Sequence, residues 1–86
     1  MKSIIINNYD STIKRGLINS KTSKKDFINK LFEEIRELEE YYILNNKLDF
    51  EELADIILVC LNCAYHYNID IERQLKNKIQ KNYKRI

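Results

Sequence analysis

Two pairs of carboxylates have a spacing that could support chemistry in this chain. Glu34 and Glu37 stand three positions apart, and Glu52 and Asp55 repeat that spacing further on. Residues three apart share a helix face, where like charges destabilise the helix unless a counter-ion neutralises them. If the residues between the pairs form a helical hairpin, both pairs converge on one place. Hard divalent cations such as Mg²⁺ favour an all-oxygen site, so the spacing predicts a magnesium site.

The position of Glu34 supports this interpretation. It lies almost within the apolar stripe of its predicted helix, where an unpaired carboxylate costs free energy. Four carboxylates at one site also repel one another, so we expect their pKa values to rise when no metal is bound. The alternative is a Glu-rich helix whose acidic face is simply solvated. The apolar stripe consists of Phe27, Leu31, Ile35, Leu38 and Tyr42.

The composition predicts the elements that must position these residues. The 86 residues include one Gly and no Pro, and the turns of sheets usually need those residues. We therefore expect a single all-α domain, residues 1–86, folded as a compact four-helix bundle. The predicted helices cover about residues 4–15, 23–45, 50–67 and 71–85.

Short side chains mark the ends of these helices. Gly16 is the one residue that adopts positive φ at little cost, so it should end the first helix. Ser23 opens the second helix as its N-cap, with Asp26 as the partner in a capping box. Asp49 and Asp70 are the predicted N-caps of the third and fourth helices.

The third predicted helix is apolar around most of its circumference. Its one polar stripe is broken by Val59, and a helix that is hydrophobic on nearly all sides must be buried on nearly all sides. Three partner helices in so small a chain can scarcely cover it. We therefore expect a homodimer or a dimer of dimers, with this helix near the interface. The polar stripe consists of Glu52, Asp55, Asn62 and His66.

Cys60 and Cys63 lie on the same helix in a C-x-x-C spacing. A structural zinc site needs four ligands, and a lone His66 cannot complete the set. Both thiols are therefore expected to be reduced and packed in the core. The longest apolar run, residues 56–61, is too short to span a bilayer, and no signal-peptide pattern opens the chain. We expect a cytoplasmic protein.

Charge is segregated along the chain. Residues 1–25 carry a net +5, residues 26–55 carry −7 and residues 56–86 carry +4. An acidic middle between basic ends suits a metal site beside a surface that binds polyanions, although solvated helix faces would give the same pattern.

The fourth predicted helix is basic and amphipathic. Leu75, Ile79 and Tyr83 are expected to pack inward. Lys78, Asn82 and Arg85 recur at i, i+4 and i+7 and so share one face, which a solvated basic tail would also present.

Taken together, three motifs resemble those of the MazG-like nucleotide pyrophosphohydrolases, part of the all-α NTP pyrophosphatase superfamily. They are the E-E-x-x-E run at residues 33–37, E-L-A-D at residues 52–55 and K-x-x-x-N-x-x-R at residues 78–85. The first motif alone is common in Glu-rich helices, and specificity comes from the order and separation of all three. The resemblance spans roughly residues 12–85.

The resemblance implies hydrolysis of a nucleoside triphosphate to the monophosphate and pyrophosphate, with Mg²⁺ or, in its place, Mn²⁺. Glu33 would either support the metal ligands from outside the coordination sphere or help to orient the attacking water. The chain has no Trp, so the aromatic residue that holds the base is left open among Tyr9, Phe32 and Tyr41. The implied metal ligands are Glu34, Glu37, Glu52 and Asp55, and the implied contacts to phosphates or sugar are Lys30, Lys78, Asn82 and Arg85.

Two other functions fit parts of the pattern. Phosphoribosyl-ATP pyrophosphohydrolases share the fold and a similar acidic motif. A non-catalytic helical interaction module would also explain the charged faces, and it could bind nucleic acid through its Lys-rich ends. However, no nucleic-acid recognition motif appears, and the sequence pI of 8.5 is below the value of about 9 that is typical of nucleic-acid-binding domains. A di-iron carboxylate bundle is excluded, because His66 lacks a Glu three residues upstream.

Overall fold

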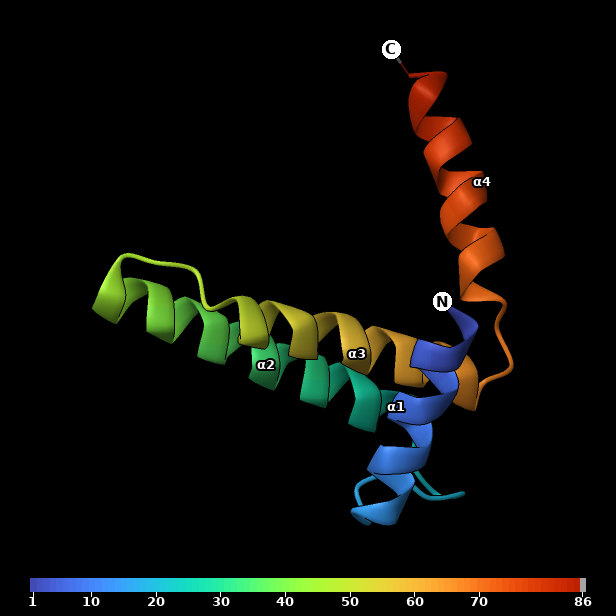
Figure 1. Cartoon of the computed structure of the whole chain (residues 1–86), viewed down its shortest axis with the longest axis horizontal. Coiled ribbons are helices and arrows are strands. Elements are labelled where there is room, and N and C mark those ends of the chain that lie inside the picture. Colours follow the sequence, from blue (N-terminus) through green and yellow to red (C-terminus); the bar gives the residue numbers. More distant parts are fainter. Residues whose placement is uncertain (86) are drawn as a thin grey trace.

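The computed structural model describes residues 1–85, which form four α-helices and no strand (Figure 1). The all-α prediction is confirmed, and each helix begins and ends within two residues of its predicted bounds. The helices are α1 (Lys2–Lys14), α2 (Lys24–Asn45), α3 (Phe50–His66) and α4 (Ile71–Tyr83).

Helices α2 and α3 form an antiparallel hairpin, and α1 crosses the end of it that lies away from its turn (Figure 1). The small core lies at this crossing and consists of four buried apolar residues, Ile18, Phe27, Leu61 and Ala64. The hairpin therefore carries the predicted acidic residues, and α1 anchors its base.

The predicted start signals of the helices are confirmed. At α2, the Ser23 hydroxyl accepts a hydrogen bond from the Asp26 N–H at 3.1 Å, and the Asp26 carboxylate accepts one from the Ser23 N–H at 2.8 Å. At α3, the Asp49 carboxylate accepts hydrogen bonds from the N–H groups of Glu51 and Glu52. These bonds satisfy donors that have no partner inside the helix.

The end of α1 is also as predicted. Gly16 has φ of +74°, and its N–H donates to the Ile13 carbonyl while the Leu17 N–H donates to the Thr12 carbonyl. This pair of bonds is a Schellman motif, which needs a residue in the left-handed region. Glycine adopts that conformation without the steric penalty of a side chain.

Helix α4 departs from the prediction of a compact bundle. Within the described residues it contacts α3 alone and points away from the hairpin (Figure 1). The expectation that Leu75, Ile79 and Tyr83 pack inward is wrong, because these side chains are 44%, 54% and 72% exposed. The direction of α4 is set by the link that precedes it, which a helical periodicity does not reveal.

One chain also leaves much of α3 uncovered. Phe50, Leu53 and Ile57 are exposed, and so is Cys60. The predicted burial of Cys60 is therefore wrong, whereas Cys63 is half-buried and its thiol pKa is raised, chiefly by that burial.

Of the helices described, none is long and apolar enough to cross a membrane.

Candidate metal centre

The hairpin brings three of the four predicted ligands together. One carboxylate oxygen from each of Glu34, Glu37 and Glu52 lies within 4.8 Å of the other two. Glu34 and Glu37 are one turn apart on α2, and Glu52 belongs to the first turn of α3. Glu34 is only 7% exposed, Glu52 is half-buried and Glu37 is exposed. We call these three residues the carboxylate cluster.

Glu52 is the least satisfied member of the carboxylate cluster. Its Oε1 atom is buried and has no hydrogen-bond partner among the described residues. When protonated, Glu52 can donate a hydrogen bond to the Glu34 carboxylate. That bond, together with burial and the charges of Glu34 and Glu37, raises the pKa of Glu52 to about 8. When Glu52 is ionised, the negatively charged carboxylates of Glu52 and Glu34 repel each other, and a bound cation would remove that repulsion.

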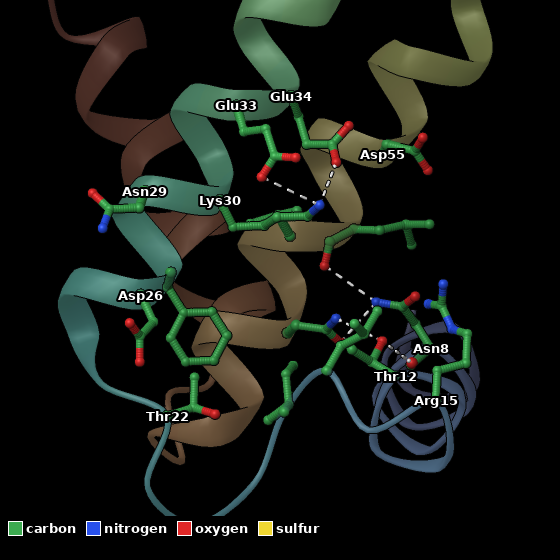
Figure 2. A pocket seen from close by; sticks show the side chains of 16 residues that line it. Asn8, Thr12, Arg15, Thr22, Asp26, Asn29, Lys30, Glu33, Glu34 and Asp55 are labelled. Atoms are coloured by element: carbon green, nitrogen blue, oxygen red, sulfur yellow. Dashed lines mark hydrogen bonds and ion pairs between the residues drawn. The ribbon is translucent and has the colours of Figure 1, made fainter.

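Lys30 supplies part of the missing positive charge. Its ammonium lies 3.0 Å from Glu34 Oε1 and 3.6 Å from Glu33 Oε2 (Figure 2). The hydrogen bond from Glu52 and the Lys30 ammonium hold the pKa of Glu34 below its ordinary value, although burial opposes them. The hydrogen bond to Glu34 raises the pKa of Lys30 in turn. The expectation that all the carboxylates have raised pKa values is therefore wrong for Glu34.

Asp55, the fourth predicted ligand, lies outside the carboxylate cluster. Three residues along an α-helix turn about 300°, so Asp55 is rotated about 60° from Glu52 toward the flank that faces α1. There it lines a cleft, and Figure 2 shows its carboxylate directed away from Glu34. The i, i+3 spacing thus places Glu52 and Asp55 on neighbouring faces of α3, of which the face with Glu52 meets Glu34 and Glu37 and the face with Asp55 borders the cleft.

The cleft has a volume of about 460 Å³ and lies between α1, the α1–α2 connection, α2 and α3. One end of it is charged, formed by Lys30, Glu33, Glu34 and Asp55, and Arg15 lies further along its wall (Figure 2). Four predicted site residues therefore line the cleft. They are the implied phosphate contact Lys30, the implied catalytic residue Glu33, and two implied metal ligands, Glu34 and Asp55.

A polar network that the sequence did not reveal forms the opposite wall. The Asn8 side-chain amide donates to Asn62 Oδ1 at 2.7 Å and to the Leu58 carbonyl at 3.1 Å. Asn62 donates to the Thr12 hydroxyl at 3.0 Å, and that hydroxyl donates to the Asn8 carbonyl. Asn62 was recognised on the polar stripe of α3, but its partner on α1 is 54 residues away, too far for spacing to identify.

None of the aromatic residues considered for the base lines the cleft. Tyr9 packs in the α1–α3 interface, where its ring lies 4.7 Å from that of Tyr65 and its hydroxyl is 2.7 Å from His66 Nδ1. Phe32 and Tyr41 are exposed on α2 and are absent from the cleft wall. Phe27, at the buried end, is the one aromatic side chain there.

The three predicted phosphate-binding residues of the C-terminal motif are not at the site in one chain. Lys78, Asn82 and Arg85 are exposed and none of them lines the cleft. They lie on and just after α4, which leads away from the hairpin (Figure 1).

Comparison of the chain with known protein families, characterised proteins and solved structures finds no match to any of them.

Proposed function

We propose that this protein is a Mg²⁺-dependent pyrophosphohydrolase that converts a nucleoside triphosphate to the monophosphate and pyrophosphate, as the MazG-like resemblance implies. The observation that supports it best is the carboxylate cluster, with its partnerless buried oxygen, beside a charged cleft. The volume of that cleft is within the range of small-molecule sites.

The carboxylate cluster fits a hard divalent cation. Octahedral Mg²⁺ holds its oxygen ligands about 3 to 4.2 Å apart, and the oxygens of Glu34, Glu37 and Glu52 lie within 4.8 Å of one another, so small side-chain movements would bring all three onto one ion. Carboxylate oxygens suit Mg²⁺ and also Mn²⁺. Asp55 remains a proposed ligand from its motif and would act from the cleft wall. The bound ion would polarise a phosphoryl oxygen and make a bound water more acidic.

The residues around the cluster would position the triphosphate. Lys30 is half exposed, and its ammonium sits where the cleft meets the carboxylate cluster. With Mg²⁺ neutralising Glu34, Lys30 would be free to contact a phosphate. Glu33, on the rim of the cleft, would accept a hydrogen bond from the attacking water. Phosphoryl transfer needs mainly positioning and charge neutralisation, which these groups can supply.

The assembly belongs to the same proposal. The hairpin side opposite the cleft exposes Ile28, Phe32 and Ile35 of α2, which recur at i, i+4 and i+7, together with Leu53 and Cys60 of α3. We call this the apolar side. Burying it against a second copy would give the expected homodimer or dimer of dimers and leave the cleft open. The proposed substrates are cytoplasmic metabolites, so the protein would act in the cytoplasm.

An assay of pyrophosphate release tests the function. The chain is incubated with a panel of nucleoside triphosphates and with phosphoribosyl-ATP, with Mg²⁺ or with EDTA. Hydrolysis of phosphoribosyl-ATP alone would favour the histidine-pathway type of enzyme, and no turnover of any substrate would favour a non-catalytic interaction module.

The matched variants are Glu52→Gln in the carboxylate cluster and Glu39→Gln on the exposed surface of α2. Because changes around metal ligands already lower activity about 10–100-fold, Glu52→Gln should lower turnover by at least about a hundredfold, while Glu39→Gln should not. Full activity in Glu52→Gln would contradict the site.

A further inference from the structure

The sequence contains two cysteines, which lie one turn apart on α3 and take no part in the proposed activity. Cys60 is exposed on the apolar side, and Cys63 is half-buried one turn further on. The pKa of the Cys63 thiol is raised first by burial and then by the charge of Cys60, so the two sulfur atoms are close to each other. The two residues therefore form a dithiol that solvent reaches through Cys60.

The spacing of the dithiol suits a shared metal ion better than a disulfide within the chain. Residues three apart on a helix have Cβ atoms about 5–6 Å apart, whereas a relaxed disulfide needs about 3.5–4.5 Å. Tetrahedral Zn²⁺ binds sulfur at about 2.3 Å, which places two sulfur atoms about 3.8 Å apart. Rotation about the side-chain bonds can bring two sulfur atoms to that separation while the helix backbone stays in place. Cys60 and Cys63 can therefore supply two of the four ligands of a structural zinc site.

One chain does not complete the set of four ligands. Within the described residues, the group of three His, Cys, Asp or Glu side chains that could hold a metal is the carboxylate cluster, which includes neither thiol. His66 is six residues from Cys60 and so is rotated about 120° from it around α3. The His66 Nδ1 atom lies 2.7 Å from the Tyr9 hydroxyl, and the ring packs against Phe27 with centroids 5.2 Å apart. Two further ligands would have to come from another molecule.

The surface around Cys60 is one that a second copy of this chain can cover. Leu53, Ile57 and Cys60 recur at i, i+4 and i+7 on α3, and all three are exposed. A stripe with this spacing is the kind along which two helices pack. A two-fold axis beside Cys60 would pair the stripe with itself and bring Cys60 and Cys63 of both copies together. Apolar surface is then buried against apolar surface, and four thiols meet.

The charges near the dithiol favour thiolates. One Zn²⁺ with four thiolates has a net charge of −2, which nearby cations stabilise. The Lys24 ammonium lies 5.7 Å from the centre of the Tyr67 ring. The pKa of Tyr67 is raised first by desolvation and then by the charges of Cys63 and Asp26, so Tyr67 has the dithiol as a neighbour. Asp26 is occupied in the capping box of α2, and Lys24 opens that helix at the positive end of its dipole.

We propose that Cys60 and Cys63 of two copies of this chain together hold one Zn²⁺ ion, which joins the copies through their apolar sides. The ion is structural, because four sulfur ligands leave no open position for water or substrate. Thiolates select Zn²⁺ over Mg²⁺, so this ion is distinct from the one proposed for the carboxylate cluster. A disulfide between the two Cys60 residues is the other way to join the copies, and it would leave Cys63 unused. The inference uses the apolar side of the proposed assembly but not the proposed activity.

Titration with Co²⁺, which takes the place of Zn²⁺ and is coloured, tests the inference. Reduced, metal-free wild-type protein is titrated in excess Mg²⁺, so that the carboxylate cluster is occupied. We expect sulfur-to-cobalt charge-transfer absorption, together with the intense visible bands of tetrahedral Co²⁺. Both should saturate at one Co²⁺ per two chains and disappear when Zn²⁺ is added. Absence of the charge-transfer band, or saturation at one Co²⁺ per chain, overturns the inference.

The matched variants are Cys60→Ser at the exposed thiol and Glu52→Gln in the carboxylate cluster. Because changes outside the ligand set already lower metal affinity about 10–100-fold, Cys60→Ser should lower the affinity for Zn²⁺ by more than about 100-fold. Glu52→Gln should leave that affinity unchanged. A Cys60→Ser variant that binds Zn²⁺ as wild type does overturns the inference. If wild type binds Zn²⁺ through sulfur and hydrolyses no nucleotide, the zinc site stands and the proposed function fails.

X-ray absorption at the zinc edge distinguishes a site shared between copies from a site within one chain. Four sulfur neighbours at about 2.3 Å are expected, and two sulfur neighbours completed by nitrogen or oxygen overturn the inference. Electrophoresis without reductant provides the arm for a disulfide. A dimer that is linked through Cys60 in the absence of metal, and that holds no sulfur-bound Zn²⁺, overturns the inference and assigns Cys60 to a redox link.

Discussion

Glu52 and Glu34 are chemically identical side chains that the fold makes unlike. Glu34 accepts a hydrogen bond from protonated Glu52 and has the Lys30 ammonium at 3.0 Å, so its pKa is lowered, whereas the same hydrogen bond and partial burial raise the pKa of the half-buried Glu52 to about 8. The carboxylate cluster therefore holds one proton at neutral pH in the absence of metal. Binding a cation has to displace that proton.

This difference predicts a pH dependence of stability. In the unfolded chain Glu52 titrates near 4.3, so between about pH 4.3 and 8 the folded state binds a proton that the unfolded state lacks. The free energy of unfolding then falls as pH rises through this window. Melting temperatures in EDTA from pH 5 to 9 should decline more for wild type than for Glu52→Gln, which has no proton to lose. If the melting temperatures of wild type and Glu52→Gln change in parallel with pH, the raised pKa of Glu52 is contradicted.

The same proton should appear in metal binding. Because Mg²⁺ competes with it, the affinity for Mg²⁺ should rise about tenfold per pH unit below pH 8 and level off above. Isothermal titration calorimetry in buffers of different ionisation enthalpy should show release of nearly one proton at pH 7. An affinity independent of pH would mean that Glu52 is not a ligand.

Among the features of the helices, the positions of their ends could be predicted from the sequence, but the face that each helix turns toward its neighbours could not. The capping residues Ser23 and Asp49 and the glycine at position 16 predicted where helices begin and end, because these depend on bonds within a few residues. The approach of α2 to α3 followed from their acidic and apolar spacing. The displacement of Asp55 from the cluster did not, because it depends on which flank of α3 meets α1.

Two other features escaped prediction for a related reason. The Asn8–Asn62 pair joins residues far apart in sequence, and the course of α4 depends on the positive φ of Asn68. Asparagine adopts that conformation more readily than most residues but does not require it. Its presence in the sequence therefore does not predict a turn of the chain away from the bundle.

The polar network predicts a stability effect at α1. Replacing Asn62 by Ala removes its bonds to Asn8 and Thr12 and leaves polar groups without partners in a buried site. Loss of about 2–4 kcal/mol in the free energy of unfolding is expected. Asn77→Ala on the exposed face of α4 is the control. Urea unfolding that finds both variants within about 0.5 kcal/mol of wild type would show that the network does not hold α1 in place.

At the scale of the whole molecule, one chain covers too little of its own apolar surface. Phe32 is 61% exposed and Phe50 is 74% exposed, and they accompany the exposed residues of α3 and α4. The cleft lies on the other side of the hairpin from the apolar side. A symmetric pairing would therefore hide apolar surface and keep the site accessible.

Light scattering tests this assembly. Wild type should be a dimer or tetramer at micromolar concentration, and Ile35→Glu, which puts a charge on the apolar side, should reduce its mass. Lys25→Glu, at an exposed position near the start of α2, is the control. A wild-type chain that is a stable monomer would contradict the assembly.

The central claim, that Glu34, Glu37 and Glu52 hold Mg²⁺, is tested most directly by thermal melts of wild type, Glu52→Gln and Glu39→Gln in EDTA and in Mg²⁺. Mg²⁺ at ten times its dissociation constant should stabilise the wild type by about 1.4 kcal/mol, a shift of about 5–10 °C for a domain of this size. Glu39→Gln should behave as wild type. At pH 8 or above, Glu52→Gln should melt higher than wild type in EDTA, because it removes a repelling charge, and should gain little from Mg²⁺. A Glu52→Gln variant that melts lower in EDTA and gains the full shift from Mg²⁺ would show that this cluster is not a metal site.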